Sequence, residues 1–174
     1  INYKYLKVSL LNFVKYILIG CLIAIHWITF FESIKLSTVS LALICLSSIS
    51  LFTALLEPLV QKRNIKFYEI ILSLLVILGI AIIFNYETLY YKAIFLSVLS
   101  AFFAALFTVL NHKLIQEKHH AITMTTWEMF GGSALITLYL LQNLAAIFFL
   151  YFYYYQLKSK NQFLLLLVLN YLNT

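Results

Sequence analysis

The sequence predicts an all-α fold, a polytopic bundle of transmembrane helices. Long charge-free apolar runs alternate with short polar gaps along the 174 residues. Apolar residues make up 64% of the chain and charged residues 10%, which leaves too few polar groups to cover a water-soluble domain. In addition, ten of the twelve Lys and Arg residues fall in alternate gaps between the runs, as in proteins that cross a membrane repeatedly.

The apolar runs have the lengths of membrane-spanning helices. A helix rises 1.5 Å per residue, so about 20 residues cross roughly 30 Å of hydrocarbon. None of the runs alternates apolar and polar residues as a barrel strand does. The runs are 16–31, 36–56, 70–86, 93–112 and 129–157.

The last run is too long for one crossing. We expect it to break near Gln142 and Asn143, which gives a fifth span from about Ala121 and a short sixth ending at Leu157. From Leu144 onward small residues nearly vanish and Phe, Tyr, Leu, Lys and Asn dominate. Two explanations stand side by side: a lipid-facing helix with an interfacial aromatic belt, or a tail translated in a shifted reading frame.

The basic residues predict the orientation of the helices. Cytoplasmic loops of membrane proteins carry an excess of Lys and Arg, and here only Lys35 and Lys92 lie in the sparse gaps. The N-terminal end is therefore expected in the cytoplasm, in a multi-pass protein of the bacterial cytoplasmic membrane. The crowded gaps hold Lys4, Lys7, Lys15, Lys62, Arg63, Lys66, Lys113, Lys118, Lys158 and Lys160.

Other classes of partner and cofactor are not expected. The positive charge is divided among short loops and forms no continuous stripe, which argues against nucleic acid as a partner. Cys21 and Cys45 lie inside apolar runs and predict neither a disulfide nor a metal site. His112, Glu117, His119 and His120 lack the spacing of metal ligands and are expected to be solvated.

Glu128 is the first candidate site residue. An ionisable group in hydrocarbon costs about 2.5 to 3.5 kcal/mol, so such residues commonly serve function. Glu128 is expected roughly 10 Å deep in the fifth span. It would bind a substrate amine or a proton, or else only bond a neighbouring helix.

His26 and Trp27 are further candidates, in the first span. His26 is expected roughly 9 Å from the outer surface, where it would bind substrate, carry a proton, or donate a structural hydrogen bond between helices. Its expected depth differs from that of Glu128 by on the order of 10 Å, so direct proton exchange between them is not expected. Trp27 would stack on a substrate or face lipid.

The second span carries a narrow face of small and polar residues. On a continuous helix Ser40, Ser47, Ala54 and Pro58 fall within about 40° of one another, with Ser50 and Glu57 at the edge. Such a face admits a close helix or a substrate, and Pro58 frees a backbone carbonyl. Glu57 lies near the cytoplasmic end, where its carboxylate can reach the interface or pair with a base. The fourth span has small-xxx-small rows that predict close packing: Ser97, Ala101 and Ala105, and Ser100, Ala104 and Thr108.

Several segments resemble one family of carriers. HWITFFESIKLSTVSLALI (26–44), SLFTALLEPLVQK (50–62) and YEIILSLLVILGIAIIF (68–84) resemble the third, fourth and fifth helices of an EamA-type repeat of the drug/metabolite transporter superfamily. SAFFAALFTVLNHKL (100–114) and TTWEMFGG (125–132) resemble the first two helices of the second repeat. The Leu-Glu-Pro at 56–58 is the most specific element.

The resemblance implies a ten-helix carrier with two inverted repeats. Residues 1–85 would hold the C-terminal helices of the first repeat, 91–143 the first two helices of the second, and 144–174 an apolar tail. It also implies cavity-lining or gating positions at His26, Trp27, Thr38, Ser40, Glu57 and Pro58, and an acidic position at Glu128. The first two helices and the last three are not expected within the chain, so this polypeptide is expected to need the missing helices or a second copy to transport.

The sequence therefore predicts a permease that moves a small metabolite by alternating access, without cofactor or metal. A non-transporting membrane fragment that only packs against a partner is the alternative. An intramembrane enzyme is disfavoured, because the chain contains no Asp, no HExxH and no GxSxG.

Overall fold

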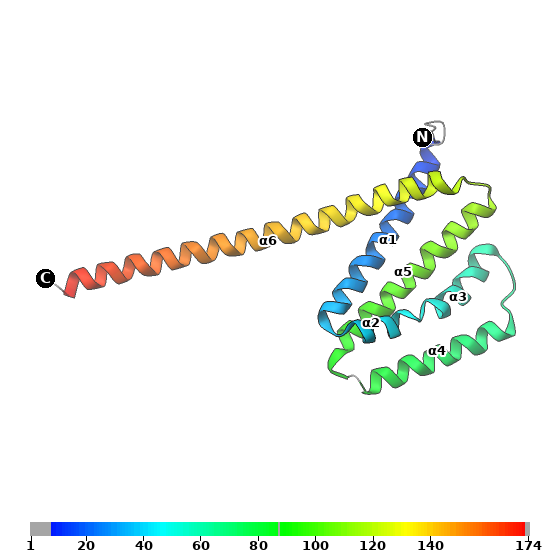
Figure 1. Cartoon of the computed structure of the whole chain (residues 1–174), viewed down its shortest axis with the longest axis horizontal. Coiled ribbons are helices and arrows are strands. Elements are labelled where there is room, and N and C mark those ends of the chain that lie inside the picture. Colours follow the sequence, from blue (N-terminus) through cyan, green and yellow to red (C-terminus); the bar gives the residue numbers. More distant parts are fainter. Residues whose placement is uncertain (1–7, 87, 173–174) are drawn as a thin grey trace. The chain divides into compact units, whose positions relative to one another are not determined.

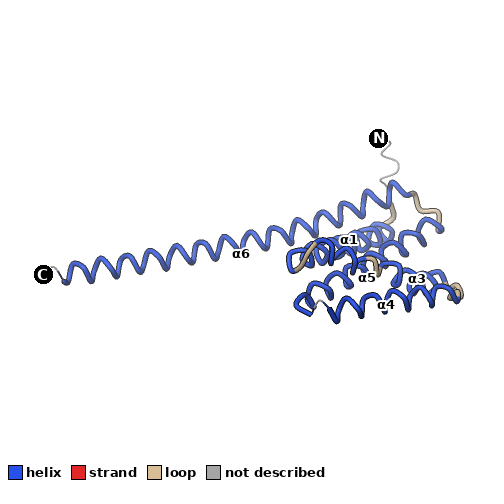
Figure 2. The backbone as a smooth tube through the Cα atoms, turned by 60° about the horizontal axis from the view of Figure 1, so that its bottom comes forward, coloured by secondary structure: helices blue, strands red, loops and turns tan. Residues whose placement is uncertain are grey.

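The computed structural model describes residues 8–86 and 88–172, and every regular element in these residues is a helix (Figures 1 and 2). The chain divides into two units, and the boundary along the sequence falls between Leu135 and Ile136. The elements are α1 (Leu10–Leu36), α2 (Val39–Leu46), α3 (Ile49–Gln61), α4 (Phe67–Tyr86), the 3-10 turn η2 (Thr88–Tyr90), α5 (Tyr91–Gln116) and α6 (Ala121–Leu172).

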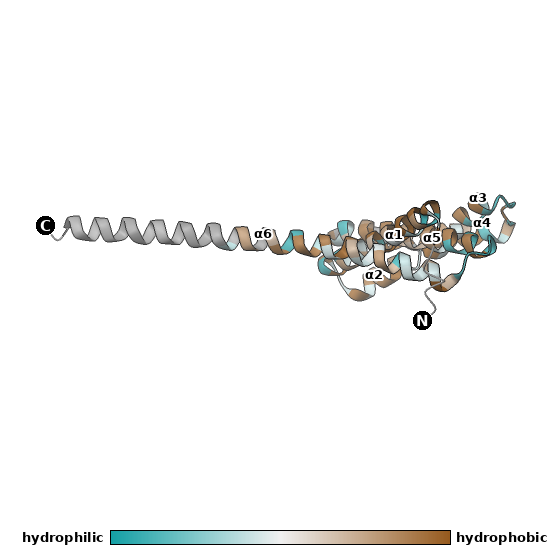
Figure 3. Ribbon diagram, turned by 90° about the horizontal axis from the view of Figure 1, so that it is seen from above, coloured by the Kyte–Doolittle hydropathy of each residue, from teal (hydrophilic) through white to brown (hydrophobic). Residues whose placement is uncertain are grey.

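Three segments of the described chain are long and apolar enough to cross a membrane: Leu10–Leu36, Val39–Gln61 and Tyr91–Gln116. Figure 3 shows apolar residues along most of α1 and α5. Many large apolar side chains in the bundle face outward, which suits a lipid environment and not water. The chain is therefore a helical membrane protein, as the apolar runs predicted.

Helix α5 lies at the centre of the first unit and contacts α1, α2 and α3 (Figure 1). Its small residues make this possible, since they let neighbouring backbones approach closely. The predicted small-residue rows are buried, except that Thr108 is exposed and bonds back to Ala104 of its own helix. The buried members are Ser97, Ser100, Ala101, Ala104 and Ala105.

Helices α1 and α5 run antiparallel. The hydroxyl of Tyr16 lies 2.5 Å from Nδ1 of His119 at one end, and Ser33 Oγ donates to the carbonyl of Ala93 at 2.9 Å at the other. Gln61 lies 2.8 Å from His112 and so brings the end of α3 to the first of these ends. The basic gaps after α3 and α5 and before α1 thus share one end of the bundle. Lys35 and Lys92 lie at the opposite end.

The second span is interrupted. The sequence predicted one continuous helix over 36–56, whereas α2 ends at Leu46 and α3 begins at Ile49. Serine hydroxyls stabilise the interruption because they replace helical donors: Ser47 Oγ donates to Ile44 at 2.6 Å and Ser48 Oγ to Cys45 at 2.7 Å. Ser47 and Ser48 keep right-handed helical backbone angles, so the narrow face that combined Ser40 with Pro58 stays a prediction.

Helix α4 packs mainly on α3, with Ile83 also against Leu41, Cys45 and Ile94, and leaves large apolar side chains exposed around its circumference. Its apolar stretch, Phe67–Ile83, is shorter than the three spans above. A helix that is apolar on all sides is typical of a lipid environment.

Helix α6 begins at Ala121, as predicted, but it does not break near Gln142 and Asn143. That prediction is wrong, because α6 continues through both residues, with Asn143 Nδ2 donating to the carbonyl of Tyr139 at 2.9 Å within the same helix. The second unit consists of the part of α6 that follows Leu135, and the described side chains there are mostly exposed.

Candidate functional site

Glu128 is the most deeply buried acidic side chain of the described residues, at 2% exposure. It projects from the third turn of α6 toward α5, where Asn111 Nδ2 donates to its Oε2 at 3.0 Å. Neither Glu128 Oε1 nor Asn111 Oδ1 has a hydrogen-bond partner among the described residues. A buried acceptor without a partner costs free energy, so these two oxygens are candidates to accept from a donor outside the described side chains.

The position of Glu128 is fixed by a close crossing of α1 and α6. A Cβ on Gly20 would collide with the carbonyl group of Glu128, and a Cβ on Gly132 would lie 3.0 Å from the carbonyl oxygen of Gly20. Gly131 comes equally close to the backbone of Ile17. The glycines thus allow the two backbones to touch beside the carboxyl group.

The pair of Glu128 and Asn111 can serve both protonation states of the carboxyl group. The amide NH₂ donates to an ionised carboxylate, whereas the amide oxygen accepts from a protonated one. An ammonium group would be held by both unpaired oxygens, because it donates three hydrogen bonds. The geometry therefore suits either a proton or an amine-bearing molecule as the missing partner.

The interruption between α2 and α3 is a second feature of functional interest. Ser97 Oγ donates to the carbonyl of Ala42 at 2.6 Å and so ties α5 to the last turns of α2. Thr38 begins α2, and its Oγ1 accepts from the amide of Leu41 at 3.2 Å. Thr38 and Ser40 are both exposed in this chain.

Glu57 belongs to a polar cluster at the end of α3. Arg63 donates to Glu57 at 3.4 Å and to both carboxylate oxygens of Glu69 at 2.7 and 3.0 Å. The sequence predicted that Glu57 pairs with a base, and this is confirmed with Arg63 as the base. The hydrogen bonds that Arg63 donates to Glu69 raise the pKa of the Arg63 guanidinium above its ordinary value. Pro58 is buried one residue further along α3.

His26 of α1 and Ser100 of α5 are joined by two hydrogen bonds, which link the two helices. Its Nδ1 lies 3.0 Å from the carbonyl oxygen of Ser100, and Ser100 Oγ donates to the carbonyl of His26 at 2.9 Å. The ring stacks on Phe30 and lies against Phe107. This arrangement fits the structural role that was the alternative for His26.

The structure does not bring the sequence candidates into one cluster. No described hydrogen bond or ring contact joins His26 to Glu128, and Trp27 is half exposed with its ring against His26 and Phe31. Glu57 and Pro58 lie in the Arg63 cluster. The candidates thus lie in separate places: on α1, at the start of α2, on α3 and on α6.

The structure adds one residue to the Glu128 site and corrects the expected environment of another. Asn111 is the partner of Glu128, and the only signal for it was an amide at the end of an apolar run. His119 was expected to be solvated, but its side chain is only 14% exposed because it packs against Tyr16. Within the described residues, no three His, Cys, Asp or Glu side chains gather as a metal ion requires.

Comparison with known proteins adds no relative. No family model matches the chain, and neither the curated proteins nor the solved structures gave a significant match.

Proposed function

We propose that the chain is the central part of a drug/metabolite-type permease of the EamA kind, which moves a small metabolite across the cytoplasmic membrane by alternating access. The observation that carries the proposal is the buried Glu128 with one carboxylate oxygen unpaired beside the unpaired oxygen of Asn111. Ionisable side chains inside membrane bundles commonly belong to substrate or ion pathways.

Two further features support a carrier. Interrupted helices line the sites of many secondary transporters, and the second span here is interrupted at Ser47 and Ser48. The resemblance in sequence assigns α1 to α4 to the end of one repeat and α5 and the start of α6 to the beginning of an inverted second repeat. In this arrangement the missing helices of the same protein, or a second copy, complete the cavity.

Glu128 would act as the binding group for a substrate amine or a coupling proton. In cells that express the complete gene, Glu128→Gln is expected to abolish uptake or efflux, because the amide neither takes up a proton nor carries the charge that holds a cation. Flux of radiolabelled candidate metabolites, with membrane insertion checked by immunoblot, measures this. Glu32→Gln is the matched control, since Glu32 pairs with Lys35 near the end of α1.

Unchanged flux of Glu128→Gln with normal insertion would remove the carrier role of this residue and favour a packing fragment. Collapse of the proton gradient separates the two ligands of the carboxyl group. Flux that survives the collapse would exclude proton coupling and leave the substrate amine.

A further inference from the structure

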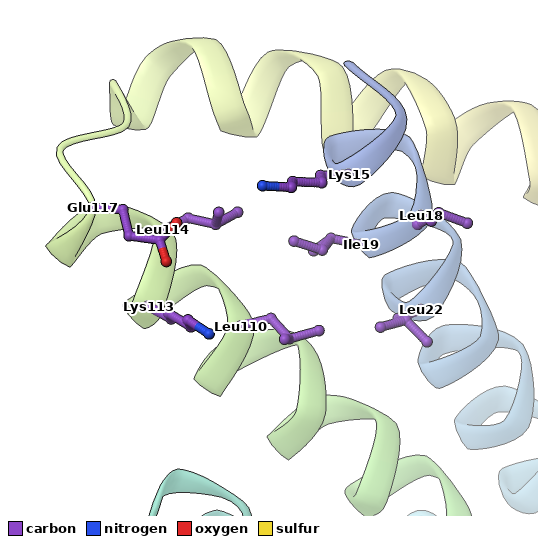
Figure 4. A pocket seen from close by; sticks show the side chains of 8 residues that line it. All are labelled: Lys15, Leu18, Ile19, Leu22, Leu110, Lys113, Leu114 and Glu117. Carbon is purple, nitrogen blue, oxygen red and sulfur yellow. The ribbon is translucent and has the colours of Figure 1, made fainter. Parts of the chain in front are cut away.

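A pocket of about 300 Å³ lies between α1 and α5, at the end of the bundle where the basic gaps gather (Figure 4). Helix α1 contributes Lys15, Ile19 and Leu22 to its wall, and α5 contributes Leu110, Lys113 and Glu117. Figure 4 shows Lys15 pointing from α1 toward α5, with Lys113 and Glu117 on the facing wall. This pocket does not include Glu128, Asn111 or the Arg63 cluster.

The two walls of the pocket share one pattern. Lys15, Ile19 and Leu22 are spaced i, i+4 and i+7 and so lie on one face of α1. Leu110, Lys113 and Glu117 are spaced i, i+3 and i+7 and so lie on one face at the end of α5. Leu22 lies about 10 Å deeper along α1 than Lys15. The pocket is therefore charged at the bundle end and apolar toward the bundle middle.

The charges favour an anion at the mouth. Neither Lys15 nor Lys113 has a described ion pair, whereas the one carboxylate, Glu117, lies 3.8 Å from Nε2 of His119. The pocket lining thus carries two positive charges and one negative charge. Lysine near a membrane surface attracts anionic lipid headgroups.

We propose that this pocket binds one acidic phospholipid, with its phosphate at Lys15 and Lys113 and an acyl chain along Ile19, Leu22 and Leu110. A free anion would use the lysines but leave the apolar wall empty, whereas a lipid uses both ends of the pocket. The position agrees, because lipid phosphates lie at the ends of transmembrane helices and acyl chains lie deeper. The proposal does not depend on transport.

Native mass spectrometry of the whole chain in detergent tests this directly. The purified chain is titrated with dioleoylphosphatidylglycerol or with dioleoylphosphatidylcholine, and the fraction that retains one lipid is measured. The acidic lipid is expected to bind more tightly. Lys15→Gln and Lys113→Gln are each expected to weaken its binding about fivefold, the value of one lysine near a lipid surface.

Lys92→Gln is the matched control, because it removes the same charge at the opposite end of the bundle, and no loss is expected. Glu117→Gln is expected to strengthen binding of the acidic lipid, since it removes a repelling charge. Excess glycerol phosphate is expected to leave the lipid bound.

Three results would overturn the proposal. The first is equal binding of the two lipids. The second is a loss in Lys15→Gln and Lys113→Gln no greater than in Lys92→Gln. The third is full displacement by glycerol phosphate, which would indicate an anion site that does not use the apolar wall.

Discussion

At the scale of single residues, three buried serine hydroxyl groups of the bundle act as links between helices. Ser33, Ser97 and Ser100 are each fully buried, and each donates to a backbone carbonyl of a neighbouring helix. In a membrane such groups need a protein partner, since no water reaches them. Glu128 differs, because its Oε1 has no partner among the described residues, and this difference is the reason to propose it as a site.

The link between Ser100 and His26 is testable by removal of one hydroxyl. Ser100→Ala is expected to destabilise the chain by about 0.6 kcal/mol, the average for hydrogen bonds between membrane helices. Thermal unfolding in detergent measures the change. Ser50→Ala is the control, because Ser50 is exposed and its hydroxyl bonds only to Ser47 nearby. Equal effects of the two substitutions would contradict a linking role for Ser100.

At the scale of elements, the crossing of α1 and α6 depends on glycine. Gly20→Ala places a methyl group against the carbonyl of Glu128, and backbone atoms cannot move aside as a flexible side chain can. We expect a loss of about 1 to 3 kcal/mol in unfolding free energy, the usual cost of overpacking. The loss is measured by unfolding in detergent.

Gly79→Ala provides the control for that experiment. A Cβ on Gly79 of α4 meets no atom within 4 Å, and alanine favours a helix more than glycine does. The substitution is therefore expected to be neutral or slightly stabilising. If Gly20→Ala were equally harmless, the close crossing would be wrong.

The connection between α3 and α4 depends on one cation. Arg63 bridges Glu57 near the end of α3 and Glu69 in the first turn of α4. Arg63→Gln is expected to lower the melting temperature, and the loss is expected to persist at high salt because Glu69 is buried and ions screen partly buried pairs weakly. Lys62→Gln serves as control, since no described ion pair includes Lys62. A loss no greater than that of Lys62→Gln would exclude the ionic explanation.

At the scale of the whole bundle, the described helices of the first unit place the gaps rich in lysine and arginine at one end and the gaps poor in them at the other. Lys15, Lys62 and Lys113 lie near one end through the contacts of Tyr16 with His119 and of Gln61 with His112, and Lys35 and Lys92 lie near the other. This agrees with the alternation of gaps in the sequence. Which end faces the cytoplasm is a prediction from the positive-inside rule.

Cysteine labelling in intact cells tests that orientation. A membrane-impermeant maleimide is expected to label Lys92→Cys in intact cells and Lys66→Cys only after permeabilisation. The unsubstituted chain is the control, because Cys21 and Cys45 lie inside spans, and Cys45 is fully buried. Labelling of Lys66→Cys in intact cells would reverse the predicted orientation.

The sequence alone determined the features that depend on composition and local spacing. Helix length follows from the length of the apolar runs. The alternation of successive gaps between the two ends of the bundle follows from the counts of Lys and Arg in the gaps. The buried rows of α5 follow from its small residues. Glu128 was also identified from the sequence, because an acidic residue deep in an apolar run stands out without knowledge of the fold.

The tertiary structure decided what depends on contacts between distant residues. The partner of Glu128 is 17 positions away on another helix, and the partner of His26 is 74 positions away, so no local pattern contains either pair. The interruption at Ser47 and Ser48 and the continuity of α6 through Asn143 are likewise seen only in the structure. Serine and asparagine allow both a continuous and a broken helix, and only the surrounding packing and hydrogen bonds select between them.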